Sequence, residues 1–117
     1  MREGETNDTM AIVLEGRVSL RMRVPERGPV SIVTIEPGDV VGWSAVVPPY
    51  RATSTAVALT DTELAQFDGP QLRELIAANA ALGAQLYPVL LKAVARRLEG
   101  TRLQLLDLFS QRGSEPW

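Results

Sequence analysis

Side chains that could bind an anion are concentrated between residues 42 and 54. The candidates are small or carry hydrogen-bonding groups: Gly42, Trp43, Ser44, Ala45, Arg51, Thr53 and Ser54. An arginine guanidinium can form two parallel hydrogen bonds to a phosphate or carboxylate, and free backbone N–H groups at a turn attract the same groups. The spacing therefore suits a site for a small anionic ligand. It suits equally well a loop that leads into a strand with a polar face.

The residue types that are missing exclude several kinds of enzyme. The chain contains no histidine and no cysteine. Zinc centres and triads with a histidine base need these side chains. Acidic residues such as Glu15, Glu36 and Asp61 are scattered beside expected turns instead of forming a catalytic pair. We therefore expect no enzyme, no catalytic residue, no metal ligand and no cofactor.

The charge and hydropathy of the chain limit its partners. Its 117 residues hold 12 basic and 14 acidic side chains, a formal net charge of −2. A surface devoted to nucleic acid or anionic lipid would carry an excess of basic residues. The polar N-terminus differs from a signal peptide, and no apolar run approaches the ~20 residues that span a membrane. These features predict a soluble, cytoplasmic domain that binds neither DNA nor membranes.

Short strands are expected over the first two thirds of the chain. Residues 17–24 (RVSLRMRV) alternate apolar and polar side chains, the period of a half-buried strand. Further apolar or β-branched runs, separated by Gly and Pro turns, lie at 11–16, 30–35, 40–43, 53–59 and 63–67. We expect the first three strands to pair as a meander. The whole set predicts a small antiparallel β-barrel or jelly roll.

From residue 68 onward the apolar period changes to that of helices. Asp68 or Gly69 can cap a short helix with Pro70 in its first turn, and Asn79 can cap a longer one. The predicted fold class is α+β, mainly β: a barrel followed by a short helix and a long C-terminal helix. The expected boundaries are 1–68 for the barrel, 69–109 for the helices and 110–117 for a frayed tail.

The long helix carries an apolar seam with spacings of three and four residues. The residues expected to contact a second copy are Leu91, Val94, Leu98, Thr101, Leu105 and Leu108. Such a seam is typical of a helix that pairs with another helix. The alternative is that the helix folds back onto its own barrel and buries the seam there. A helix of ~30 residues extends about 45 Å, farther than one small barrel needs, and this favours a homodimer.

Basic side chains also recur along this helix, at Lys92, Arg96, Arg97 and Arg102. Glu99 and Asp107 interrupt them, and no recognition helix follows. A solvated helix face is therefore expected, and not a stripe that binds DNA.

Four segments carry a family resemblance: LEGRVSL at 14–20, EPGDVVGWSAV at 36–46, ALTDTELAQFD at 58–68 and RRLEGTRLQLL at 96–106. Together they resemble the cyclic nucleotide-binding domain of the catabolite activator (Crp/Fnr-like) superfamily. The helices and first strand that usually open such a domain are missing, as is the helix-turn-helix domain that usually follows it. The resemblance implies a sensor whose long helix pairs with its copy across a two-fold axis and passes on the ligand signal.

The resemblance also implies roles for residues 42–54, the phosphate-binding cassette of that family. In the family a glutamate accepts a hydrogen bond from the ribose 2′-hydroxyl, and an arginine pairs with the phosphate. Gly42 matches the cassette glycine, but Trp43 stands where the glutamate belongs, and an indole N–H only donates. Arg51 lies one residue before the arginine position, which Ala52 occupies, although a β-bulge could bring Arg51 back. The cassette is therefore expected to be degenerate.

Three hypotheses follow for the function. The first is a sensor domain with a degenerate cassette that signals through its dimerisation helix. The second is a genuine receptor of a transcription regulator for cyclic AMP, cyclic GMP or another anion, with Arg51 pairing with the phosphate. The third is a structural dimerisation module, with Trp43 filling the cavity and Arg51 stacked on Tyr50 at the surface. A filled cavity beside Trp43 favours the module, and an open cavity with Arg51 inside favours the receptor.

Overall fold

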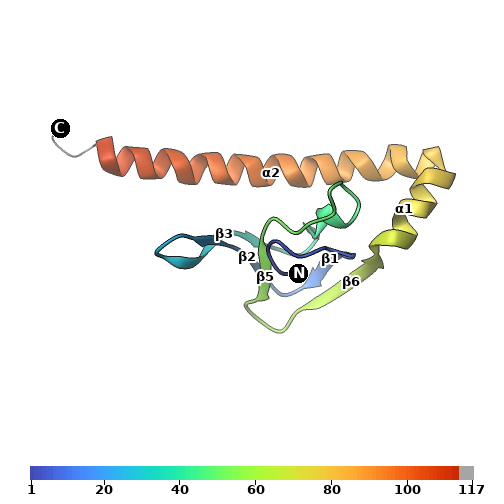
Figure 1. Ribbon diagram of the computed structural model, residues 1–117, viewed down its shortest axis with the longest axis horizontal. Coiled ribbons are helices and arrows are strands. Elements are labelled where there is room, and N and C mark those ends of the chain that lie inside the picture. Colours follow the sequence, from blue (N-terminus) through green and yellow to red (C-terminus); the bar gives the residue numbers. More distant parts are fainter. Residues whose placement is uncertain (114–117) are drawn as a thin grey trace.

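All six predicted strands are present in the computed structural model, which describes residues 1–113. They are β1 (Thr9–Glu15), β2 (Val18–Val24), β3 (Gly28–Ile35), β4 (Val40–Val41), β5 (Thr55–Ala58) and β6 (Glu63–Asp68). The strands form two three-stranded antiparallel sheets, in the orders β4-β1-β6 and β3-β2-β5 (Figure 1). Alternation over residues 17–24, together with the apolar and β-branched runs between turns, thus located the strands correctly.

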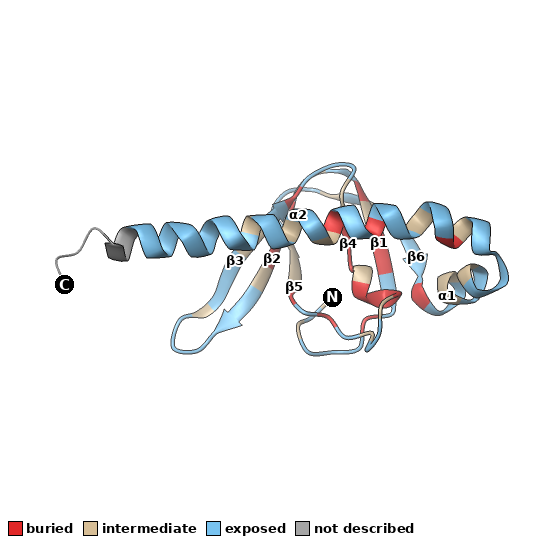
Figure 2. Cartoon of the chain, turned by 90° about the horizontal axis from the view of Figure 1, so that it is seen from above, coloured by how far each residue is buried: buried red, intermediate tan, exposed pale blue. Residues whose placement is uncertain are grey.

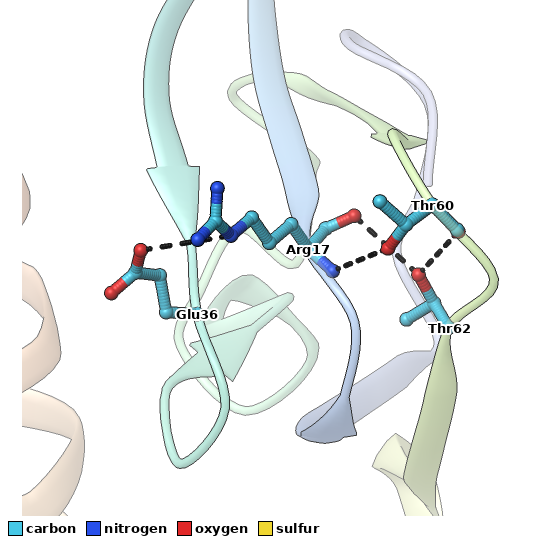
Figure 3. A network of polar contacts seen from close by, with 4 residues as sticks. All are labelled: Arg17, Glu36, Thr60 and Thr62. Carbon is cyan, nitrogen blue, oxygen red and sulfur yellow. Dashed lines mark hydrogen bonds and ion pairs between the residues drawn. The ribbon is translucent and has the colours of Figure 1, made fainter.

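The expectation that the first three strands pair as a meander is wrong. β2 and β3 form a hairpin, but β1 pairs with β4 and β6 in the other sheet. The chain leaves this sheet at Gly16, where φ is 89° and an added Cβ would lie 2.4 Å from the carbonyl oxygen of Asp61. The next residue, Arg17, accordingly bonds to the β5–β6 turn, and its N–H donates to Thr60 Oγ1 at 3.1 Å (Figure 3). This corner separates β1 from β2.

The core has two parts, one between the sheets and one beneath the long helix. Inward-facing strand residues form the first cluster: Val13, Val18, Leu20, Ile35 and Val41. The second cluster lies where helix α2 (Ala80–Gly113) crosses the strands, and consists of Met10, Val40, Ala45, Val46, Leu90 and Ala93. Farther along α2 the Gln104 side chain still donates to the Ile32 carbonyl of β3, but residues 101–110 are all exposed (Figure 2). Leu90 and Ala93 therefore attach α2 to the barrel.

Both helices begin at the predicted caps. The Asp68 side chain accepts a hydrogen bond from the N–H of Gln71 at 3.0 Å at the start of α1 (Gly69–Ala78). The Asn79 side chain accepts from the N–H of Ala81 at 3.1 Å at the start of α2. Helix α2 continues to Gly113, beyond the boundary expected at 109. The rest of the expected tail, residues 114–117, lies outside the described residues.

The predicted fold class is confirmed: a mainly β, jelly-roll-like unit followed by a short helix and a long one. Neither of the described helices combines the length and the apolar character that crossing a bilayer requires.

Candidate ligand-binding site

A cavity of about 240 Å³ lies between sheet β3-β2-β5, the loop after β4 and the middle of α2. The strands contribute Leu20, Met22, Ile32 and Val33, and Met1 joins them. The loop contributes Gly42, Trp43, Ser44, Thr53 and Ser54. Helix α2 contributes Val94, Arg97, Leu98 and Thr101. Trp43 packs against the second core cluster, but it leaves the cavity beside it open.

Five of the seven residues predicted at the site line this cavity, and two do not. Ala45 is fully buried in the second core cluster. Arg51 is exposed and takes part in a β-bridge with Thr6 on the outer side of the loop. The structure thus brings five residues of the 42–54 segment to the cavity without Arg51.

The main chain on either side of Arg51 explains its position. Tyr50 and Ala52 are tied to the N-terminal segment: the N–H of Asn7 donates to the Tyr50 carbonyl at 2.8 Å, and the N–H of Ala52 donates to the Glu5 carbonyl at 2.9 Å. Successive residues of an extended segment point to opposite sides. Ala52 points inward and is 4% exposed, so Arg51 points outward. No bulge restores the arginine to the phosphate position.

The expected stacking of an arginine on Tyr50 occurs with a different partner. The guanidinium carbon of Arg73, on α1, lies 3.9 Å from the centre of the Tyr50 ring. This contact is a cation–π interaction. It fixes the outer side of the loop, and it leaves Arg51 without the stacking partner expected from the sequence.

Gly42 shapes the loop at the entrance to the cavity. Its φ is 81°, and an added Cβ would lie 2.5 Å from the carbonyl oxygen of Thr9. Only glycine fits there without strain. The turn continues as a single 3₁₀ turn, η1 (Trp43–Ala45), closed by a 3.0 Å bond from the N–H of Ala45 to the Gly42 carbonyl. The glycine therefore sets the path that brings Trp43 and Ser44 to the cavity.

Asn7 holds this turn in place and was not apparent as a site residue from the sequence. Its side-chain N–H₂ group donates to the Gly42 carbonyl at 3.1 Å and to Ser44 Oγ at 3.0 Å. Asn7 is 5% exposed, so these bonds satisfy a buried amide. Its partners lie 35 and 37 residues away in the sequence, and no local pattern links them. Asn7 is a positioning residue of the loop.

Arg97 is the arginine that the cavity contains, and for this residue the prediction of a solvated basic face is wrong. Arg97 shares a face of α2 with Leu90 and Ala93, at helical spacings of four and seven residues, and that face is turned to the barrel. Its Nη2 atom is buried and has no hydrogen-bond partner among the described residues. Burial lowers the pKa of Arg97, while the charge of Asp39 acts in the opposite direction. A positive charge is thus held in a largely apolar setting.

Asp39 does not neutralise Arg97 by direct pairing, because it is paired with Arg96. Arg96 Nη1 lies 2.6 Å from Asp39 Oδ1, an ion pair between α2 and the turn before β4. The exposed side chain of Arg102 forms a longer contact, 3.4 Å, with Glu99 on the same helix. Arg96 and Arg102 therefore match the expected solvated face, and Arg97 alone departs from it.

The chemistry available in the cavity is that of anion binding. Around Arg97 the hydrogen-bonding side chains in the wall are the hydroxyls of Ser44, Thr53, Ser54 and Thr101. Within residues 1–113 no group of three or more His, Cys, Asp or Glu side chains could hold a metal ion. The arrangement can attract an anion and surround it with apolar surface.

The residues of the predicted dimer seam divide into two groups. Val94, Leu98 and Thr101 border the cavity. Leu91, Leu105 and Leu108 are 70%, 52% and 55% exposed. The seam is not buried against its own barrel, so it stays available for a second copy, and its middle part adjoins the ligand cavity.

Comparison with known proteins identifies a family and relatives of this chain. Residues 1–79 match the family model of the cyclic nucleotide-binding domain. A CRP-like cAMP-activated global transcriptional regulator of Mycobacterium tuberculosis is 31% identical over 106 residues, which are 91% of this chain and 46% of the relative. The chain therefore spans about half the length of the curated relatives it matches.

Solved structures agree with this match. A putative cyclic nucleotide-binding protein from Geobacter metallireducens superposes with a TM-score of 0.73 at 31% identity, covering 84% of this chain and 70% of that one. A cyclic nucleotide-binding domain from Methylobacillus flagellatus superposes with a TM-score of 0.81 at 22% identity, covering 92% and 60%. The second likeness supports the fold.

Proposed function

The chain belongs to the cyclic nucleotide-binding domain family, and on that premise we propose that it is a sensor domain with a degenerate phosphate-binding cassette, which signals through α2 as a homodimer. The family is regulatory and not a class of enzyme, which supports a sensor role. Two features of the cavity set this chain apart from a cyclic nucleotide receptor. The acceptor position holds Trp43, and Arg51 points outward beside the inward-facing Ala52.

The observation that carries this proposal is the position of Arg97. The cavity lacks Arg51 but contains the partly buried guanidinium of Arg97, supplied by α2, whose buried Nη2 atom has no hydrogen-bond partner within the described part of the chain. A buried N–H group without a hydrogen-bond partner is costly, so its presence in an open cavity favours an anionic ligand over a purely structural role. Because the guanidinium and the dimer seam lie on one helix, a ligand on Arg97 would act directly on the element that pairs.

A second candidate is a genuine cyclic nucleotide receptor. The likeness to a regulator whose name describes it as cAMP-activated favours it, as does the open cavity. The degenerate sensor binds cyclic nucleotides weakly or not at all because of Trp43 and Ala52. The genuine receptor binds them in spite of these two residues.

Restoring the two missing family residues tests the proposal. In the double variant Trp43→Glu, Ala52→Arg, a carboxylate and an inward arginine return to the cassette, and cyclic AMP binding should strengthen by at least tenfold over the unmodified chain in titration calorimetry. The control is Arg51→Ala, which removes the outward arginine and should leave binding unchanged. Weaker nucleotide binding in the Arg51→Ala variant than in the unmodified chain would favour the genuine receptor.

A further inference from the structure

The cavity combines one partly buried guanidinium, that of Arg97, with walls that are mostly hydrocarbon. Within the described part of the chain, Arg97 supplies the only charged side chain of its lining. Facing it are aliphatic side chains of β2 and β3, such as Leu20, Ile32 and Val33, together with the indole of Trp43. Such a wall stabilises an apolar body and offers few hydrogen bonds to a sugar or a base.

The charge balance of the cavity favours a ligand with a single negative charge. Arg97 carries one positive charge, and the Asp39 carboxylate nearby is already paired with Arg96 at 2.6 Å. A monoanion would neutralise the guanidinium. A dianion such as a phosphate monoester would keep an uncompensated charge among apolar side chains, which is costly.

The side chains that would recognise ribose are absent from the lining. No Asp, Glu, Asn or Gln side chain borders the cavity among the described residues, so a ribose hydroxyl would find no carboxylate or amide acceptor. The cavity volume of about 240 Å³ leaves room for a medium-chain acid or a substituted aromatic acid.

We infer that the cavity takes an amphipathic monoanion, a carboxylate carried on an apolar chain or ring, with the carboxylate on Arg97 and the apolar part against Leu20, Val33 and Trp43. This inference rests on the proposed sensor function and names the ligand class of the same site. The bidentate geometry of a guanidinium suits a carboxylate. The hydroxyls of Thr53 and Ser54 are neighbouring donors that can share the carboxylate oxygens, whereas the Thr101 hydroxyl already donates to the Arg97 carbonyl at 2.9 Å.

The test uses octanoate as the probe and the fluorescence of Trp43 as the readout. The chain has two tryptophans, and the variant Trp117→Phe leaves Trp43, in the cavity wall, as the reporter. Octanoate should change this fluorescence with saturation, and the uncharged octanamide should bind at least tenfold more weakly. Arg97→Met, which keeps an apolar stem and removes the charge, should weaken octanoate binding at least tenfold. The matched control Arg102→Met, on the exposed side of the same helix, should leave it unchanged.

Several results of these titrations would overturn the inference or the proposed function. Equal binding of octanoate and octanamide, or equal binding by the Arg97→Met and unmodified chains, would overturn the inference, as would no response to octanoate at millimolar concentration. Cyclic AMP is titrated in parallel. Low-micromolar binding of cyclic AMP contradicts the degenerate cassette itself, whereas no response to either compound contradicts only the ligand class. The melting temperature of each variant confirms that it is folded.

Discussion

At the scale of single residues, the site depends on contacts between positions far apart in the sequence. Asn7 joins the N-terminal segment to the loop at Gly42 and Ser44. Replacing Asn7 by Ala leaves the Gly42 carbonyl and the Ser44 hydroxyl without their buried donor. Unfolding in urea should show a loss of about 1–3 kcal/mol, the usual cost of an unsatisfied buried group. A change below about 0.5 kcal/mol, the range of ordinary surface substitutions, would mean that Asn7 does not hold the loop.

Some residues of the cavity could be predicted from the sequence, and others could not. Gly42, Ser44, Thr53 and Ser54, predicted as ligand-binding residues, do lie together in the cavity wall, because they belong to one loop; their binding of a ligand stays a prediction. Arg97 was not predicted as a cavity residue. Its basic neighbours made it appear part of a solvated face, and only the docking of α2 through Leu90 and Ala93 turns it inward.

At the scale of elements, α2 has a half that is anchored in the core and a half that is largely exposed. Leu90 is 3% exposed in the second core cluster, whereas Leu103 is 57% exposed beyond the barrel. Leu90→Ala should lower the free energy of unfolding by about 2–5 kcal/mol, because it leaves a cavity under the helix. Leu103→Ala removes the same atoms from the surface and should change it by about 0.5 kcal/mol or less. Equal effects in thermal or urea unfolding would mean that α2 is not anchored where the structure shows it.

Element boundaries followed from the sequence more reliably than element pairing did. Alternation over residues 17–24 and apolar or β-branched runs between turns located the strands, and Asp68 and Asn79 located both helix starts, since these signals act over a few residues. The assignment of β1 to the sheet of β4 and β6 depends on the close approach of Gly16 to the turn at Asp61. That contact spans 45 residues of sequence, and no local signal announces it.

At the scale of the whole molecule, the exposed half of α2 explains the elongated shape, 59 Å in its longest dimension (Figure 1). Its seam residues are exposed in a single chain, and exposed apolar stripes of this kind mark contact surfaces. We therefore predict a two-fold dimer through α2. Leu105→Asp would place a charge in the apolar contact and should yield a monomer in light scattering at tens of micromolar, the range in which weak pairs form.

The control for the dimer lies two residues away. Leu103 is as exposed as Leu105 but lies on the far side of the helix, outside the seam. Leu103→Asp should therefore leave the dimer intact. A monomeric unmodified chain, or an equal loss of the dimer in both variants, would contradict pairing through the seam.

The most direct test of the whole account is a calorimetric titration of the unmodified chain with cyclic AMP. With Trp43 in place of the sugar acceptor and Arg51 outside the cavity, the lost contact to the ribose alone should forgo about 1.5–3 kcal/mol, or roughly one to two decades in affinity. We predict no measurable heat, or a dissociation constant of about 100 μM or weaker. Binding at low micromolar concentration or tighter would contradict the degenerate cassette and would make this chain a cyclic nucleotide receptor.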